Sequence, residues 1–243
     1  MRTRRCYLDI ETFPLTGRAW GPKWETSLIR IDKPITLASF AWKFDDTPVQ
    51  CIALPDVGSQ SALVKALWKV FDEAQIIVAH NGKAFDIKQS NAFFLTNHLT
   101  PPSPYVVVDT KTEAKRYFKF PSNSLDDLGQ FLGVGKKEAT GGIDLWWGCE
   151  ANEPEAWRKM KKYNKQDVVL LEKIYTTMLP WMRIHPNLNV YEDRVKSCRN
   201  CLSQRLQSRG KQVLRNGHAL RYVCNDCGAW NQGAFVKHET LIK

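Results

Sequence analysis

The segment RCYLDIE, residues Arg5–Glu11, alternates apolar and polar side chains and therefore predicts a β-strand. Leu8 and Ile10 lie on one face of this strand, and Asp9 and Glu11 lie on the other. Two neighbouring carboxylates on so apolar a strand repel each other unless a cation lies between them. The segment therefore predicts an interior strand that carries a metal-binding acidic pair. The alternative is a solvated edge strand with an outward acidic face.

The rest of the chain predicts an α/β domain around this strand. Apolar alternation and short apolar runs indicate strands, and apolar residues at steps of three and four indicate helices. We expect strands at residues 5–11, 35–44, 49–54, 76–79 and 105–109. We expect helices at residues 61–74, 86–96, 124–132 and 154–178, so that strands and helices alternate along the second half of the domain. This order predicts a mixed five-stranded sheet with helices on its faces. The connection 12–33 is expected to be an irregular functional loop.

Two further acids stand out from their surroundings. Asp167 shares a helical face with Met160, Tyr163 and Leu171, and a buried carboxylate needs a cation or hydrogen bonds. A salt bridge to a nearby Lys or Arg is the alternative for this residue. Asp86 begins a helix directly after a polar turn, where aspartate ordinarily caps free backbone N–H groups. Taken alone, Asp86 is interpreted as a helix cap.

Taken together, the acids form three short motifs in chain order. These are Asp9-x-Glu11, Asn81-x-x-x-Phe85-Asp86 and Tyr163-x-x-x-Asp167. They resemble the exonuclease motifs of the DEDD superfamily, in its tyrosine-type branch, which includes proofreading domains of DNA polymerases and the ribonuclease D group. The histidine-type branch would place a histidine at position 162, which is a lysine here. The resemblance covers about residues 5–180 and implies a ribonuclease-H-like fold.

The resemblance also implies a mechanism with two divalent cations, Mg²⁺ or Mn²⁺. Asp9 would bridge both ions, Glu11 and Asp167 would complete one site, Asp86 would hold the other ion, and Tyr163 would orient the attacking water. Trp20 and Trp24 in the connection 12–33, and Trp146 and Trp147 in an expected glycine-rich loop before the last helix, could stack on bases, although packing in the core or a lid is the alternative. The residues expected to contact substrate are Thr12, Trp20, Trp24, Asn81 and Phe85.

The C-terminal segment differs from the rest of the chain in its paired cysteines and its positive charge. Cys198-x-x-Cys201 and Cys224-x-x-Cys227 are separated by 22 residues, a spacing typical of a structural Zn²⁺ site with four thiolate ligands, and the segment resembles a zinc ribbon. Residues 194–243 hold ten Lys and Arg against two acids, which accounts for +8 of the net charge of +10. We expect an exonuclease domain at 1–185 and a basic ribbon at 190–243 that binds nucleic acid or a replication protein.

These features predict a metal-dependent 3′→5′ exonuclease that acts on single-stranded or frayed 3′ ends, with DNA favoured over RNA, in proofreading, repair or replication. The alternatives are an exoribonuclease of the ribonuclease D kind and an inactive nucleic-acid-binding adaptor. The sequence has neither a secretory pattern nor the ~18 apolar residues of a membrane span, so we expect no membrane partner and an intracellular, cytoplasmic protein. A nuclease of this size with no polymerase attached is typical of a bacteriophage or bacterium.

Overall fold

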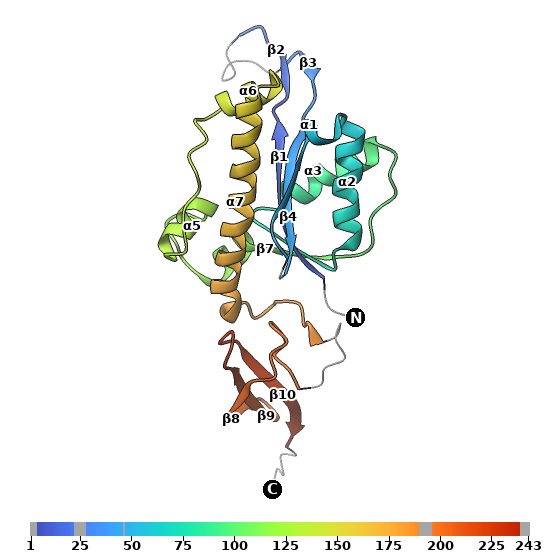
Figure 1. Cartoon of the computed structure of the whole chain (residues 1–243). Coiled ribbons are helices and arrows are strands. Elements are labelled where there is room, and N and C mark those ends of the chain that lie inside the picture. The colour runs from blue at the N-terminus through green and yellow to red at the C-terminus, as the bar shows by residue number, and fades with distance from the viewer. Residues whose placement is uncertain (1–3, 22–27, 46, 190–195, 239–243) are drawn as a thin grey trace. The chain divides into compact units, whose positions relative to one another are not determined.

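The computed structural model of the chain divides into two compact units, which are drawn together in Figure 1. The structure describes residues 4–21, 28–45, 47–189 and 196–238. We call the first unit the sheet unit; it contains Arg4–Lys115 and Phe120–Ile174. We call the second the ribbon unit; it contains Arg116–Lys119 and the chain from Tyr175 onward.

The sheet unit is built on a five-stranded sheet with β1 (Arg5–Phe13) at its centre. β1 pairs antiparallel with β4 (Thr36–Phe44) and parallel with β6 (Ile76–Ala79), and the full order is β5-β4-β1-β6-β7. The outer strands are β5 (Gln50–Ala53) and β7 (Val106–Asp109). The expected mixed sheet is therefore confirmed, and β1 is an interior strand rather than an edge strand.

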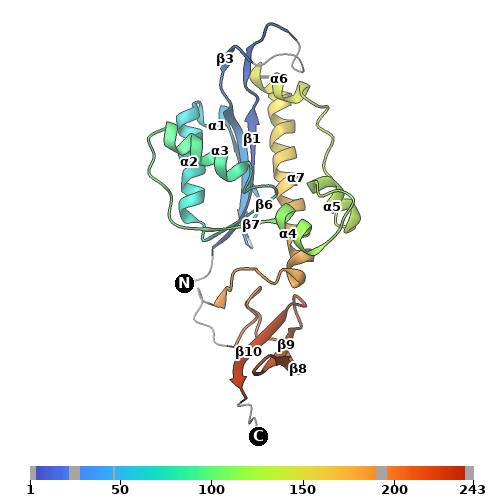
Figure 2. The same ribbon diagram turned by 180° about the vertical axis from the view of Figure 1, so that it is seen from behind.

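Helices cover both faces of this sheet (Figures 1 and 2). On one face, α2 (Gln60–Glu73) and α3 (Asp86–Thr96) pack against the apolar side of β1, where Leu8 and Ile10 are buried in the main core. The other face is covered by α7 (Pro154–Met178), with α5 (Leu125–Phe131) beside it. Successive side chains of a strand point to opposite faces, so Asp9 and Glu11 lie on the side of α7.

The apolar stripe of α7 explains how this helix is fixed to the sheet. Trp157, Met160 and Tyr163 are buried in one cluster with Phe13 of β1, whose ring meets Trp157 edge to face at 5.9 Å between centroids. Burial of large aromatic side chains stabilises such a contact strongly. Since Asp167 lies one turn beyond Tyr163 on the same stripe, the packing that holds α7 also brings this acid to β1.

Two sequence expectations for the sheet unit were wrong. The connection 12–33 is not irregular throughout, because β2 (Thr16–Arg18) and β3 (Arg30–Lys33) form a two-stranded antiparallel sheet. The backbones approach closely at Gly17, where a Cβ would lie 2.4 Å from the carbonyl oxygen of Arg30. The second error concerns Trp146 and Trp147, expected in a glycine-rich loop, which lie on a short helix, α6 (Asp144–Glu150).

Three short or polar elements were not expected at all. They are α1 (Leu54–Val57), α4 (Thr110–Tyr117) and the 3₁₀ helix η1 (Leu179–Trp181). Within the described ranges, no helix is long and apolar enough to span a membrane.

The ribbon unit contains a three-stranded antiparallel sheet in the order β10-β9-β8. Its strands are β8 (Leu206–Leu214), β9 (Gly217–Cys224) and β10 (Trp230–Lys237). Next to this sheet, a small buried cluster consists of Cys198, Cys224 and Ala229, with only a few half-buried neighbours. So small a cluster contributes little hydrophobic stabilisation to the three strands, which makes a metal cross-link the expected source of their stability.

Candidate functional site

Three carboxylates from two distant parts of the chain meet at the centre of the sheet unit. β1 supplies Asp9 and Glu11, and α7 supplies Asp167. One oxygen from each of them lies within 4.8 Å of the others. Such a set of hard oxygen ligands suits Mg²⁺ or Mn²⁺, which bind one or a few carboxylates and complete their coordination with water and phosphate oxygens.

The electrostatics of this cluster favour a bound cation. Burial, followed by the charges of Glu11 and Asp167, raises the pKa of Asp9 well above its usual range. Burial and the charge of Asp167 raise the pKa of Glu11 to about 8. The Asp167 side chain is only 1% exposed, and its Oδ1 has no hydrogen-bond partner among the described residues. Acidic groups are therefore in excess in this cluster, and the residues present fit a divalent cation.

Lys137 supplies part of the missing charge. Its Nζ lies 2.6 Å from Oδ2 of Asp167 and 4.9 Å from the ring centroid of Tyr163. Burial alone would lower the pKa of Lys137, but the charge of Asp167 raises it above its usual value, so the ammonium stays charged. The salt-bridge alternative for Asp167 is thus observed. One ammonium cannot balance three clustered carboxylates, so the cluster still fits a divalent cation.

Asp86 approaches β1 from the side of β6. β6 pairs only with Arg5–Tyr7, so β1 runs past its end and the N–H of Ile10 has no strand partner there. That N–H donates to Oδ1 of Asp86 at 3.2 Å. The N-cap residue of α3 is Phe85, whose side chain makes no capping hydrogen bond, and Asp86 is the first residue of the helix. Its Oδ1 faces β1, so the side chain does more than cap the helix. Burial raises the pKa of Asp86 to about 7, although the bond from Ile10 opposes this shift.

Asp86 does not join the mutual cluster of the other three acids. Asp86 lies beside them because it accepts a hydrogen bond from the N–H of Ile10, the residue that follows Asp9 in β1. The four acids are thus arranged as a compact group of three with a fourth at its edge. The group of three suits one divalent cation.

Asn164 is a site residue that the sequence analysis missed. Its Nδ2 donates to Oδ2 of Asp9 at 2.6 Å and to the Asp9 carbonyl at 3.2 Å. Its Oδ1 accepts from the hydroxyl of Ser39 at 3.0 Å, and its side chain is fully buried. Asn164 therefore fixes the rotamer of Asp9. The sequence did carry a signal for this residue, because Asn164 places an amide in the apolar stripe of α7 three residues before Asp167.

Tyr163 lies on α7 one turn before Asp167. Burial and the charge of Asp167 raise its pKa above the ordinary tyrosine value, so the phenol keeps its proton at neutral pH. Its ring packs edge to face against Trp146 at 6.4 Å between centroids. Tyr163 therefore presents a positioned hydroxyl donor beside the acidic cluster.

The residues expected to contact substrate are only partly brought to the site. Thr12 is half-buried on β1, next to Glu11. Asn81, at a left-handed φ of 65°, donates its N–H to Asp109, and Phe85 beside Asp86 is 39% exposed. Trp20 is 89% exposed after β2, and nothing in the described residues links it to the acids. Trp24 lies outside the described residues.

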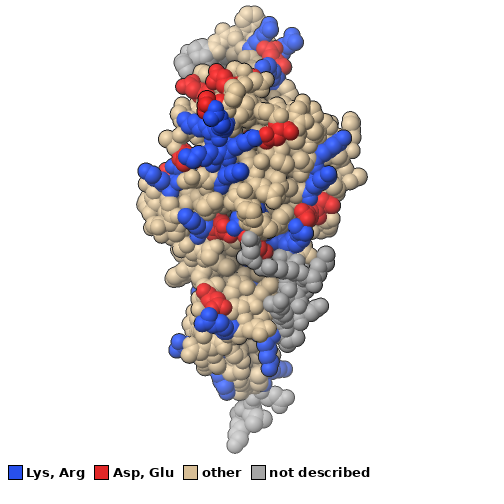
Figure 3. All heavy atoms as spheres, in the orientation of Figure 1, with Lys and Arg blue, Asp and Glu red and all other residues tan. Residues whose placement is uncertain are grey.

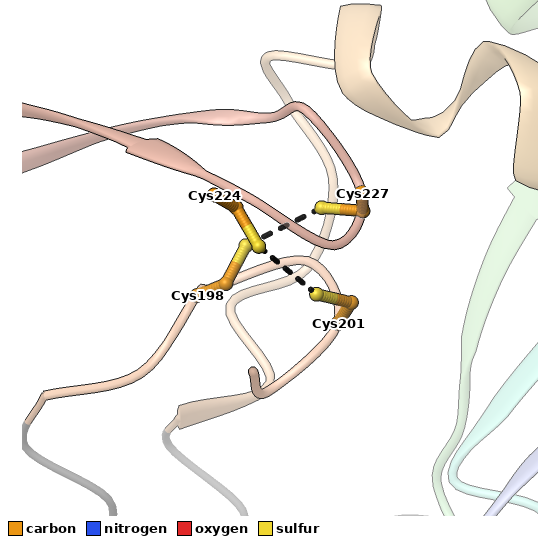
Figure 4. Close-up of side chains that lie close together, drawn as sticks. All are labelled: Cys198, Cys201, Cys224 and Cys227. Carbon is orange, nitrogen blue, oxygen red and sulfur yellow. Dashed lines mark hydrogen bonds between the residues drawn. The ribbon is translucent and has the colours of Figure 1, made fainter. Parts of the chain in front are cut away.

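The second candidate metal centre is in the ribbon unit, where four thiols converge (Figure 4). The Sγ atoms of Cys198 and Cys227 are 3.6 Å apart, as are those of Cys201 and Cys224. Tetrahedral Zn²⁺ with Zn–S bonds of ~2.3 Å places its sulfurs roughly 3.8 Å apart. The four thiols are free of disulfides, and their spacing fits one Zn²⁺.

Comparison with known proteins agrees with this fold. The family model of the RNase H superfamily matches residues 6–179. A family B DNA polymerase from the hyperthermophilic archaeon Pyrobaculum calidifontis has a similar structure, with a TM-score of 0.55 and 14% identity over 74% of this chain and 25% of the polymerase chain. This chain thus spans a quarter of the polymerase, and at that identity the similarity shows the fold alone. A search of curated proteins gave no match.

The raised carboxylate pKa values predict how stability depends on pH. Folded Glu11 holds a proton to about pH 8, whereas the unfolded chain releases it near pH 4, so without metal the melting temperature should fall as pH rises from about 6.5 to 8. Added Mg²⁺ should raise the melting temperature more at pH 8 than at pH 6.5, because protons compete with the cation. Calorimetry of the protein and of Glu11→Gln, whose pH slope should be shallower, tests this. Equal Mg²⁺ effects at both pH values would contradict it.

The thiol cluster predicts one zinc per chain. Cys198→Ser and Cys224→Ser should lose the zinc and make the ribbon unit sensitive to proteolysis, because its small core cannot hold the strands together. Elemental analysis and limited proteolysis measure both effects. Cys51→Ser, a half-buried thiol of the sheet unit, is the matched control and should keep its zinc. Zinc retained in both ribbon variants would exclude the site.

Proposed function

This chain belongs to the RNase H superfamily, and from that membership we propose that it is a metal-dependent 3′→5′ exonuclease. Its substrates are single-stranded or frayed 3′ ends, with DNA favoured over RNA. The single observation that carries the proposal is the meeting of Asp9, Glu11 and Asp167 within 4.8 Å, from a strand and a helix more than 150 residues apart. A purely structural interior would pair such acids with cations of the chain itself, whereas Lys137 is the one cation that pairs with them among the described residues.

Asp9, Glu11 and Asp167 would hold one divalent cation, and Asp9 with Asp86 would hold the other. When bound, these ions would activate the attacking water and stabilise the leaving oxygen of the phosphodiester. Asn164 orients Asp9 toward the ions. Tyr163, protonated at neutral pH, donates a hydrogen bond that orients the water.

The exonuclease assignment and the 3′→5′ direction are supported by the motif set. Tyrosine at 163 with aspartate at 167 is the pattern of the tyrosine-type DEDD branch, and the pair lies on one turn of α7. DNA is favoured because a DNA polymerase is among the solved structures that share this fold. A chain that trims only RNA would keep the same acids and belong to the ribonuclease D kind.

The test is degradation of oligonucleotides labelled at the 5′ end, as matched single-stranded DNA and RNA, with Mg²⁺ or Mn²⁺. The unmodified protein should give a ladder that shortens from the 3′ end, and a 3′-terminal phosphorothioate should delay it. Asp9→Asn and Asp167→Asn should lower the rate at least about a hundredfold, because each removes a ligand of the ions. Tyr163→Phe should cause a smaller loss that appears in kcat.

Glu73→Gln is the matched control, since Glu73 is a surface carboxylate of α2 that pairs with Arg4 at 2.6 Å. It should retain full activity. Circular dichroism and melting temperature show whether each variant is folded. Full activity of folded Asp9→Asn or Asp167→Asn, or no turnover of any substrate by the unmodified protein, would overturn the proposal.

Asn164 gives a separate prediction about positioning. Asn164→Ala removes the bonds that hold Asp9, and loss of a group that orients a metal ligand commonly weakens metal affinity by about 10- to 100-fold. The Mg²⁺ concentration for half-maximal activity should rise accordingly, while the rate at saturating Mg²⁺ changes less. A Mg²⁺ titration measures both quantities. An unchanged Mg²⁺ requirement would show that Asn164 serves only packing.

A further inference from the structure

The ribbon unit has a hollow of about 610 Å³ that the nuclease chemistry does not use. We call it the tryptophan hollow, and its main lining residues are Trp181, Arg183, Arg199, Arg221, Trp230 and Gln232. Its volume falls in the range of ~300–1,000 Å³ typical of ligand sites. Every lining residue belongs to the ribbon unit.

Two indole rings at the hollow are exposed. Trp181, at the end of η1, is 62% exposed, and Trp230, at the start of β10, is 55% exposed. Trp181 packs edge to face against Phe118 at 5.8 Å, and the guanidinium of Arg221 lies 5.7 Å from the ring of Trp230. Both rings are therefore held by neighbours while much of their surface stays open. Exposed, positioned aromatic faces lining one hollow are suited to stacking with a planar ligand.

The charge of the hollow is positive. Arg183, Arg199 and Arg221 line it together with amides, and no carboxylate is among the lining residues. In the described part of the ribbon unit the only carboxylate is Asp226, which pairs with Arg205 at 2.7 Å. On the face drawn in Figure 3, Lys and Arg likewise predominate over acids on this unit. The hollow therefore attracts anions.

Two of the three arginines, Arg199 and Arg221, are held by backbone carbonyls. Nη2 of Arg221 donates to the carbonyl of Arg209 at 3.0 Å, and Nη2 of Arg199 donates to that of Arg183. A guanidinium has five N–H donors, so these bonds orient the group and leave further donors for a ligand. Planar donors of this kind match the geometry of phosphate oxygens.

We propose that the tryptophan hollow binds single-stranded nucleic acid. Bases stack on Trp181 and Trp230, while Arg183, Arg199 and Arg221 contact the phosphates. This combination tracks a strand without reading its sequence. The proposal adds a second nucleic-acid contact outside the acidic cluster, and it stands whether or not that cluster cleaves.

The hollow also depends on the thiol cluster. Asn231 donates through Nδ2 to Sγ of Cys198 at 3.4 Å, and its Oδ1 accepts the backbone N–H of Arg199 at 2.9 Å. One side chain thus links a metal-binding thiol to an arginine of the hollow. Loss of zinc should therefore weaken nucleic-acid binding even where the lining residues are unchanged.

The experiment measures binding of fluorescein-labelled single-stranded DNA to the full chain by anisotropy, with Asp9→Asn in every variant to prevent cleavage. Trp181→Ala and Trp230→Ala should each weaken binding by roughly 5- to 150-fold, the range of one base–aromatic stack. Trp230→Phe should retain most of the affinity, because it keeps an aromatic face. Arg221→Ala should reduce the slope of log affinity against log salt by about 0.7, the value for one phosphate contact.

Phe235→Ala and Arg215→Ala are the matched controls, an exposed aromatic of the same sheet and an exposed arginine outside the hollow. Both should keep the parent affinity, and zinc content shows whether each variant has a folded ribbon. Unchanged DNA binding in a zinc-loaded Trp181→Ala, Trp230→Ala double variant would overturn the proposal. So would an oligoglutamate peptide that binds the hollow as tightly as DNA, since this would mark a protein-docking site.

The cleavage assay separates this inference from the proposed function. If the protein with its native acids degrades DNA and the tryptophan variants bind normally, the hollow proposal fails and the function stands. If no oligonucleotide is degraded but the tryptophan variants lose DNA binding, the function fails and the hollow proposal stands.

Discussion

The repulsion among Asp9, Glu11 and Asp167 is the constraint on which the sheet unit depends. Three carboxylates within 4.8 Å, in an interior that raises their pKa values, would separate if their elements could move. They stay together because Leu8 and Ile10 anchor β1 in the main core and Trp157 and Met160 anchor α7 to the opposite face. Hydrophobic packing on both sides thus holds together charges that only a cation can satisfy.

The same packing explains why much of the fold was predictable from the sequence. β1, β4 and β6 carry buried apolar side chains, and α7 carries an apolar stripe, so their periodicity reports burial directly. β2 and β3 are exposed along their whole length, so no alternation marks them. Helix α4 is charged and short, and α6 is short, which leaves their patterns too weak to detect.

Site residues could be predicted from the sequence where a charged side chain occurs among apolar neighbours. Asp167 is an acid in an apolar stripe, and that conflict is visible in the sequence. In the sequence, Asp86 fits the ordinary role of a helix cap, and its contact with the N–H of Ile10 depends on β1 extending past the end of β6. Lys137 could not be found in this way, and the amide of Asn164 in the buried stripe did not reveal its partner, because the contacts of these residues with Asp167 and Asp9 are set by tertiary packing.

The two units offer ligands that suit different metal ions. The sheet unit offers oxygen ligands, which select hard ions that exchange readily with water and phosphate, whereas the ribbon unit offers four thiolates, which select zinc in a closed site. The sheet unit has a large core that needs no metal, whereas the apolar cluster around the thiols of the ribbon unit consists only of Cys198, Cys224 and Ala229 with a few half-buried neighbours. Metal loss should therefore have different consequences in the two places. In the sheet unit it removes charge compensation from a fold that persists, and in the ribbon unit it removes the cross-link that holds the strands and orders the hollow through Asn231.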